Sequence, residues 1–249
     1  MSAVADGLLD GAPDAISRAR LLATSAKESG AWLYALPISS SGLRMDDNTI
    51  RVAVGLCIGA PLGRPHLCHH CGANVDHLAL HGLSCQRSQG RFHHHAALND
   101  IVHRSLAAAQ VPSRLEPTGI VHSVGKRPDG VSLVPWKCGR LLVWDVTCPD
   151  MYAPSYVAGA TSEAGAVAVL AETKKKSKYS FLDSGHSFLP VVCESSGVIG
   201  PLALAFLREL GSRLSQISGE PKSHQYLLQR VSVAVQRGNT ASVMGSFGP

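Results

Sequence analysis

The sequence predicts an α/β fold built from a helix, a run of strands and a second helix–strand pair. Apolar residues at helical spacing are followed by short strand-like runs, and then by another helix and another strand-like run. With 249 residues and 45% hydrophobic content, the chain is long enough to bury a sizeable core. The expected core elements are a helix at 95–110, strands at 114–122, 127–134 and 140–148, a helix at 163–178 and a strand at 187–194.

Before this core, the sequence predicts a loose tail over the first dozen residues and one helix at 15–29. Asp14 can cap the start of that helix, and Gly30 can end it. A mixed connecting segment follows, and then a stretch rich in cysteine, histidine and glycine. The predicted division is an N-terminal tail and helical linker at 1–65, a Cys/His segment at 66–92 and a main domain at 93–249.

The helices of the main domain have clear sequence limits. The first is expected to turn four apolar residues inward, namely Leu98, Ile101, Val102 and Leu106. Two further helices are expected to close the chain. Proline fits the first turn of a helix and glycine favours its end, so Pro201 and Pro221 mark the starts and Gly219 and Gly238 the ends.

Charge and cysteine content narrow the class of protein. The formal net charge of +5 and the pI of about 8.9 are compatible with a nucleic-acid partner. No apolar run is long enough to cross a bilayer, and the N-terminus lacks the basic start and apolar core of a secretory signal. Seven cysteines, three of them in one short segment, favour a reducing compartment and a metal site over a disulfide framework. Serine-hydrolase, phosphate-loop and dinucleotide-binding motifs are absent.

Two aspartates are predicted to face each other across a β-hairpin. If the turn is centred on Lys137, one side of the hairpin carries the pairs Leu133–Leu141, Val131–Val143 and Asp129–Asp145. Directly opposed side chains have Cβ atoms roughly 4.5–5.5 Å apart, so two carboxylates repel unless a cation or a shared proton lies between them. A divalent metal with oxygen ligands suits this pair, with magnesium the first candidate.

The helix at 163–178 is predicted to bring a lysine to these carboxylates. Lys175 and Lys178 fall on the apolar stripe of the helix, whereas Lys176 points away. A lysine that faces the core is costly unless it meets a charge, which a carboxylate or a bound phosphate would supply. Beside a metal it would orient water and neutralise charge on phosphorus. The structural alternative is that Pro-Asp-Gly forms an ordinary turn and KKKSK a solvated charge run.

The segment CHHCGANVDHLALHGLSC predicts a zinc site. Cys68 and Cys71 are separated by two residues, and each can occupy a neighbouring corner of a tetrahedron. His81 and Cys85, separated by three residues, form the second pair. Four protein ligands make such a site structural rather than catalytic. The alternative is a set of buried free thiols. The main rival of His81 is His77, and the weaker rivals are His66, His69 and His70.

In order and spacing, these motifs resemble the restriction-enzyme-like endonuclease region of non-LTR retrotransposon polyproteins. The motifs are Cys-x2-Cys, His-x3-Cys, a histidine-rich helix start with Asn99-Asp100, RPDG, WDVT and KxxKY. The resemblance covers most of residues 15–245 in general character and is closest from Cys68 to Tyr179. It implies a PD-(D/E)XK restriction-endonuclease-like core with an upstream CCHC zinc knuckle. It also implies magnesium-dependent nicking of one DNA strand by phosphodiester hydrolysis, which leaves a primer end for reverse transcription.

The resemblance also implies roles for individual residues. Asp129 matches the aspartate of the PD motif and Asp145 the second acidic position, so both are expected to bind Mg²⁺. The displaced lysine and the tyrosine of the KxxKY pattern match Lys175 and Tyr179, with Lys178 between them. The implied zinc ligands are Cys68, Cys71, His81 and Cys85.

The sequence departs from the family pattern at several points. Thr147 stands two residues after the second acid, where the general nuclease fold often places its lysine. A third carboxylate is expected from Glu116 or Glu194, and the sequence does not favour either. The chain is too short for a reverse transcriptase and has no Tyr-x-Asp-Asp motif. It is therefore expected to be a detached C-terminal portion, as a gene fragment, a truncated element or a recruited domain.

The expected function is that of a retrotransposon-derived, metal-dependent DNA endonuclease in the nucleus, with RNA as a second possible partner. The alternative is a catalytically inert nucleic-acid-binding module or a truncated retroelement remnant. In an inert module, basic residues near the knuckle and the hairpin would hold phosphates, namely Arg87, Arg91, Lys126 and Arg127. The histidine run at 93–95 is expected to be a polar helix start or a phosphate contact. No sequence feature predicts the oligomeric state.

Overall fold

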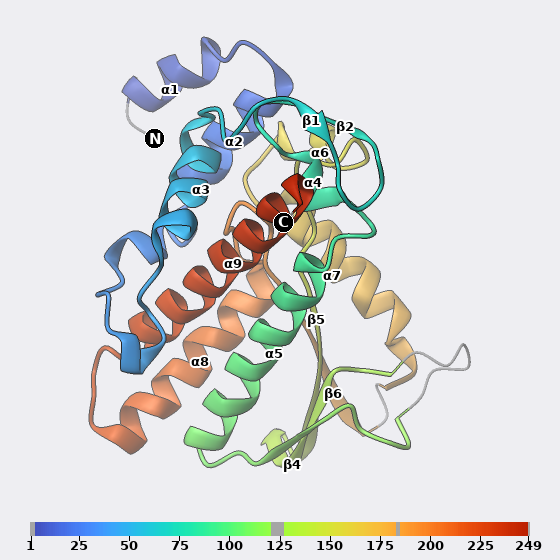
Figure 1. The fold of residues 1–249 in the computed structure, drawn as a ribbon. Coiled ribbons are helices and arrows are strands. Elements are labelled where there is room, and N and C mark those ends of the chain that lie inside the picture. The colour runs from blue at the N-terminus through green and yellow to red at the C-terminus, as the bar shows by residue number, and fades with distance from the viewer. Residues whose placement is uncertain (1–2, 121–126, 183–184, 249) are drawn as a thin grey trace.

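A four-stranded mixed sheet forms the centre of the α/β core in the computed structural model, which describes residues 3–120, 127–182 and 185–248 (Figure 1). The strand order is β3-β4-β5-β6, with the first two pairings antiparallel and the last parallel. The predicted α/β class is thus confirmed. The strands are β3 (Ser113–Leu115), β4 (Gly130–Lys137), β5 (Arg140–Thr147) and β6 (His186–Val192).

Helices cover both faces of the sheet, and side chains that alternate along β5 pack against the helices on each face. Leu142, Trp144 and Val146 face a cluster that contains residues of α5 (Gly90–Ala108), α8 (Pro201–Ser218) and α9 (Ser223–Phe247). Val143 faces the opposite side, towards Tyr179 and the end of α7 (Ala166–Lys178). The four apolar residues predicted to face inward from the first core helix are all buried: Leu98, Ile101, Val102 and Leu106.

The β4–β5 hairpin turns further along the chain than predicted. Lys137 pairs with Arg140, so the two-residue turn is formed by Cys138 and Gly139. Both turn residues have positive φ, 50° and 73°, as a type I′ hairpin turn requires. The prediction that the turn is centred on Lys137 is therefore wrong, and the reason is this left-handed turn conformation.

Irregular pairing in β4 then restores the predicted register near the base of the hairpin. Leu141 pairs with Pro135, so the predicted Leu133–Leu141 pair is wrong, and Leu133 is exposed. Proline has no N–H to donate, which accounts for an interrupted ladder at this point. Beyond the irregularity the predicted Val131–Val143 pair is confirmed.

The N-terminal part is more helical than predicted. The expected loose tail is wrong, because α1 spans Ala3–Asp10. The next helix, α2 (Ala15–Ser25), ends before Gly30, and its predicted cap is confirmed by a bond from the Ser17 N–H to Asp14 (2.7 Å). The remaining elements are η1 (Ala31–Tyr34), η2 (Ser39–Ser41), α3 (Asp47–Ile58), β1 (His66–Leu67), β2 (Asn74–Val75), α4 (His81–Ser84), α6 (Val157–Ala160) and η3 (Ser180–Leu182).

The last helix continues past its predicted end. Gly238 was expected to end it, but α9 runs on to Phe247. The glycine serves packing here, because a Cβ at Gly238 would collide with the buried ring of His94. Pro221 lies just before α9 rather than in its first turn, whereas Pro201 does begin α8 and Gly219 ends it.

The N-terminal helices, the Cys/His segment and the last helix share one core. A single buried cluster contains Val52 of α3, Cys68 and Cys85 of the Cys/His segment, and Val243 of α9. The predicted boundaries at 65 and 92 remain predictions. Within the described residues, no helix has the length and apolar content needed to cross a membrane.

Candidate active site and metal centre

Asp145 lies on β5 and is the centre of a buried polar cluster. Its side chain is on the face of the sheet that carries Val143, and the residue is only 4% exposed. The Lys175 ammonium pairs with Oδ2, and the Tyr179 hydroxyl donates to Oδ1 (2.5 Å). The Lys178 ammonium lies 3.8 Å from Oδ1. Both lysines on the predicted stripe therefore reach the same carboxylate.

The end of α7 positions these three partners. Lys175 and Lys178 are in its last turn, and Tyr179 is the residue that follows the helix. The Tyr179 ring is fully buried and packs on Phe188, with ring centroids 4.5 Å apart. Burial, followed by the hydrogen bond to Asp145, raises the pKa of Tyr179. The phenol consequently stays protonated and acts as a donor.

Asp129 immediately precedes β4, and the predicted Asp129–Asp145 pair is not among the residue pairs of the β4–β5 ladder. The last rung is Gly130–Trp144, and the Asp129 N–H donates to the Trp144 carbonyl (3.0 Å). The Asp129 carboxylate instead accepts from the Val146 N–H (2.6 Å), which lies beyond the end of β4. Asp129 therefore lies at the end of the sheet where β4 begins, beside the strand that carries Asp145.

His95 is the partner that sequence reasoning missed. Its Nε2 lies 2.9 Å from Asp129 Oδ2, and this hydrogen bond raises the pKa of His95 although burial opposes it. Burial raises the pKa of Asp129, but the hydrogen bond and charge of His95 outweigh it and hold that pKa below 3.8. The charge of Asp145 also raises the pKa of His95, so one imidazole responds to both carboxylates.

A spacing signal for His95 was present in the sequence. Asn99 lies one helical turn further along α5, and its Oδ1 accepts from the Trp144 indole N–H (3.0 Å). This bond fixes α5 against β5 one residue before Asp145. The spacing of four between His95 and Asn99, which places both on one face of a core helix, therefore indicated that this face contacts the site.

Neither candidate for a third carboxylate is placed as an additional metal ligand. Glu194 is 1% exposed, and its Oε1 accepts from the Ala168 N–H (2.8 Å), which satisfies the start of α7. The Glu116 side chain is exposed, and its backbone N–H donates to the Asp129 carbonyl (2.8 Å).

A basic groove leads from these residues to the Cys/His segment. One cavity of about 510 Å³ is lined by Arg91, Lys175 and Lys178, and an adjoining one of about 520 Å³ by Arg91, Phe92 and His95. The two share Thr147 and further residues, so they form a continuous depression. Phe92 is 77% exposed, which leaves an aromatic face beside the arginine.

The Cys/His segment brings the four predicted zinc ligands together, namely Cys68, Cys71, His81 and Cys85. Their ligand atoms all lie within 4.8 Å of one another. The Cys68 and Cys85 sulfurs are 3.9 Å apart, close to the edge of about 3.8 Å expected for a tetrahedron with Zn–S bonds of about 2.3 Å. The group can therefore hold a metal ion such as zinc.

Local structure explains why these ligands converge. A turn closes on Cys68, whose N–H donates to Ala73 (2.8 Å), while the Cys85 N–H donates to His81 (2.9 Å) across one helical turn. A hydrogen bond from the Ala73 N–H, with a further one from His81, lowers the pKa of Cys71 to about 7. Metal ligation requires this thiolate form.

The rival histidines lie outside the metal-ligand group. His66 stacks on Phe247 and contacts Ser246, and His77 is exposed. Of the basic residues considered for phosphate contact, Arg87 and Arg91 are exposed beside the Cys/His segment. The Arg127 carbonyl oxygen lies 3.1 Å from the Tyr179 hydroxyl oxygen, and Lys126 lies outside the described residues.

Compared with models of known protein families and with characterised proteins, the chain matches none.

Proposed function

We propose that this protein is a metal-dependent DNA endonuclease that nicks one strand by phosphodiester hydrolysis. The observation that carries the proposal is the cluster around Asp145, in which Lys175 and Tyr179 meet a buried carboxylate beside the Asp129–His95 pair. A core with helices on both faces of a mixed sheet supports a PD-(D/E)XK-like arrangement. The resemblance to retrotransposon endonucleases, and with it a nuclear location, belongs to this proposal.

The donor set fits Mg²⁺. Asp129 and Asp145 supply carboxylate oxygens from adjacent strand ends, and oxygen is the ligand atom that magnesium prefers. His95 pairs with Asp129, and the charge of Asp145 also raises the pKa of His95. When bound, the ion would polarise the phosphate and compensate its charge.

The protein side chains have distinct tasks in this reaction. A water oxygen forms a bond to phosphorus as the bond to the 3′-oxygen breaks, and the departing oxygen takes up the proton that water loses. The Lys175 and Lys178 ammonium groups neutralise charge that develops on the phosphate. His95 and Val146 orient Asp129 through its Oδ2 atom. Tyr179 holds Asp145 in place through Oδ1.

The groove and the Cys/His segment support the choice of DNA as substrate. Arg91 and the lysines of α7 line one continuous basic surface that passes the cluster. Basic side chains along a groove bind backbone phosphates and release counterions. We assign the Cys/His segment a structural zinc ion, which would hold the start of α5, and with it Arg91, beside this groove.

A nicking assay on supercoiled plasmid tests the proposal. With Mg²⁺, we expect Asp145→Asn to reduce the nicking rate about 100-fold or more. The matched control is Asp47→Asn, because Asp47 is an exposed aspartate of α3. Lys175→Gln should reduce the rate more than Lys178→Gln, since the Lys178 ammonium is 3.8 Å from the carboxylate. Equal nicking by Asp145→Asn and wild type would overturn the site assignment.

A non-catalytic nucleic-acid-binding module is the second candidate. The observation that favours it is that Lys175, Lys178 and Tyr179 already surround both Asp145 oxygens. Such a module would bind DNA with strong salt dependence and show no Mg²⁺-dependent nicking. The same plasmid assay, with a binding measurement beside it, separates the two functions.

A further inference from the structure

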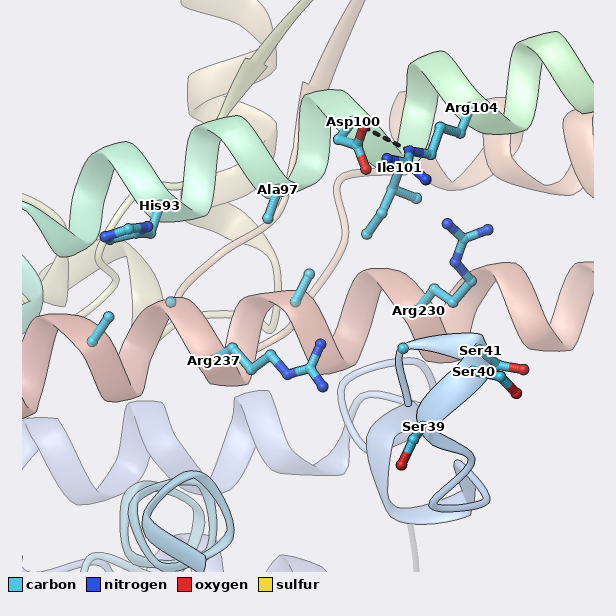
Figure 2. A pocket seen from close by; sticks show the side chains of 14 residues that line it. Ser39, Ser40, Ser41, His93, Ala97, Asp100, Ile101, Arg104, Arg230 and Arg237 are labelled. Carbon is cyan, nitrogen blue, oxygen red and sulfur yellow. Dashed lines mark hydrogen bonds and ion pairs between the residues drawn. The ribbon is translucent and has the colours of Figure 1, made fainter. Parts of the chain in front are cut away.

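A second basic cavity lies on the other side of α5 from the candidate active site. It has a volume of about 610 Å³ and lies between α5, α9 and the Ser39–Ser41 turn (Figure 2). His93 lines this cavity, whereas His95 contacts Asp129. Residues two apart on a helix point about 200° from each other, so α5 separates the two sites.

Positive charge dominates the cavity. Among its described lining residues, Arg104, Arg230 and Arg237 are opposed by one carboxylate, that of Asp100. Figure 2 shows the arginines on two facing helices, with Arg230 and Arg237 on α9 and Arg104 on α5. Guanidinium groups recognise phosphate through paired N–H donors. An excess of such groups around one hollow indicates an anionic ligand.

The arginines differ in how far their donors are already used. Arg104 bonds to Asp100 (2.8 Å) on the exposed side of α5, and Arg237 donates to the Arg44 carbonyl (2.5 Å). Within the described part of the chain, Arg230 has neither a hydrogen bond nor an ion pair. Its donors are therefore available to a ligand.

Small residues also line the cavity. Ala97 of α5 and Ala234 of α9 both line the cavity, and neither side chain is long enough to fill the space. Ala241 continues the same face of α9. The cavity is therefore lined by both small residues and arginines.

The spacing of the arginines suits a chain of phosphates better than a single anion. Arg230 and Arg237 are seven residues apart on α9, which corresponds to about 10 Å along the helix axis. Phosphates of one DNA strand advance by about 3.4 Å per nucleotide. A segment of about three or four nucleotides covers this length, so consecutive phosphates can each meet one arginine.

We propose that this cavity binds consecutive backbone phosphates of a nucleic-acid strand and anchors it away from the candidate active site. The choice of nucleic acid rests on the proposed function, but the site and its residues are separate from the Asp145 cluster. Anchoring at a second place would fix the direction of the strand across α5.

Salt-dependent binding of a fluorescein-labelled DNA duplex, measured by anisotropy with Ca²⁺ in place of Mg²⁺, tests this site. We expect Arg230→Gln to weaken binding and to reduce the slope of log K against log [NaCl] by about 0.9. The double variant Arg104→Gln/Arg230→Gln should reduce it by about 1.8. Arg140→Gln is the matched control, because it removes one exposed arginine from the far end of the β4–β5 hairpin.

Wild-type slopes in the double variant, or no DNA binding by the wild type, would overturn the inference. Inorganic phosphate at matched ionic strength is the second arm. If it abolishes the difference between variant and wild type, the cavity is a single-anion site and the backbone assignment fails. Plasmid nicking by the same proteins keeps the two proposals apart. Reduced slopes without wild-type nicking contradict the endonuclease alone, and unchanged slopes with nicking contradict this cavity alone.

Discussion

Removing one buried hydroxyl, in Tyr179→Phe, should destabilise the fold without opening a cavity. The Tyr179 hydroxyl donates to Asp145 Oδ1 (2.5 Å) and accepts from the Lys178 ammonium (2.8 Å). Phenylalanine keeps the ring and its contact with Phe188, at a centroid distance of 4.5 Å. The variant therefore isolates the polar contacts of a fully buried residue.

The expected loss follows from the charge on the acceptor. A hydrogen bond to an ionised group contributes about 1.5–3 kcal/mol, and Asp145 is only 4% exposed, so water cannot replace the missing donor. For a chain of this size, 1 kcal/mol corresponds to about 2–4 °C in Tm, so the expected decrease is about 3–12 °C.

Urea unfolding followed by circular dichroism measures this loss. The midpoint should fall with an unchanged m-value, because the surface exposed on unfolding stays the same. Tyr226→Phe is the control, since that tyrosine is 40% exposed. In an Asp145→Asn background the effect of Tyr179→Phe should shrink by about 1 kcal/mol or more. If Tyr179→Phe and Tyr226→Phe unfold at the same midpoint, the hydroxyl does not hold Asp145 and the reasoning fails.

Three further predictions concern the metal group, a buried acid and a packed glycine. Cys85→Ser should lose about one equivalent of zinc by elemental analysis and unfold at a lower temperature, whereas the exposed Cys138→Ser should match wild type. Burial raises the pKa of Asp150 from 3.8 to about 6, so the folded state holds a proton that the unfolded chain releases, and stability falls as pH rises through this range. Asp150→Asn should remove that decrease and exceed wild type by on the order of 3 kcal/mol at pH 7, with no difference below pH 4; parallel pH profiles would contradict the assignment. Gly238→Ala should cost about 1–3 kcal/mol because its Cβ meets a buried imidazole, while Gly159→Ala, with open space around it, should be neutral by thermal unfolding.

Local patterns in the sequence were sufficient for several parts of the site. Helical periodicity placed Lys175 and Lys178 on one stripe, and both reach Asp145 in the structure. Short spacings selected the metal group, because one turn and one helical turn bring Cys68, Cys71, His81 and Cys85 together. In each case the geometry is fixed by neighbouring residues, so no distant contact was needed to predict it.

The hairpin shows where such local rules stop. The Val131–Val143 pair was predictable, but the turn at Cys138 and the irregularity at Pro135 were not. The register of a hairpin depends on the conformation of its turn. The later turn shifts the pairing in one direction, and the irregularity around Pro135 shifts it back, so Val131 still pairs with Val143. The Asp129 carboxylate is consequently held by a hydrogen bond from the Val146 N–H and not by pairing with Asp145 in the ladder.

The sequence by itself therefore determined the α/β class, the lysine-bearing stripe and the metal-ligand group, since each is encoded in residues close along the chain. Tertiary structure decided that His95 meets Asp129, that Glu194 supports a helix start, and that Gly238 receives the His94 ring. These contacts join segments far apart in sequence. Their geometry depends on how helices pack on the sheet, which no short pattern of residues specifies.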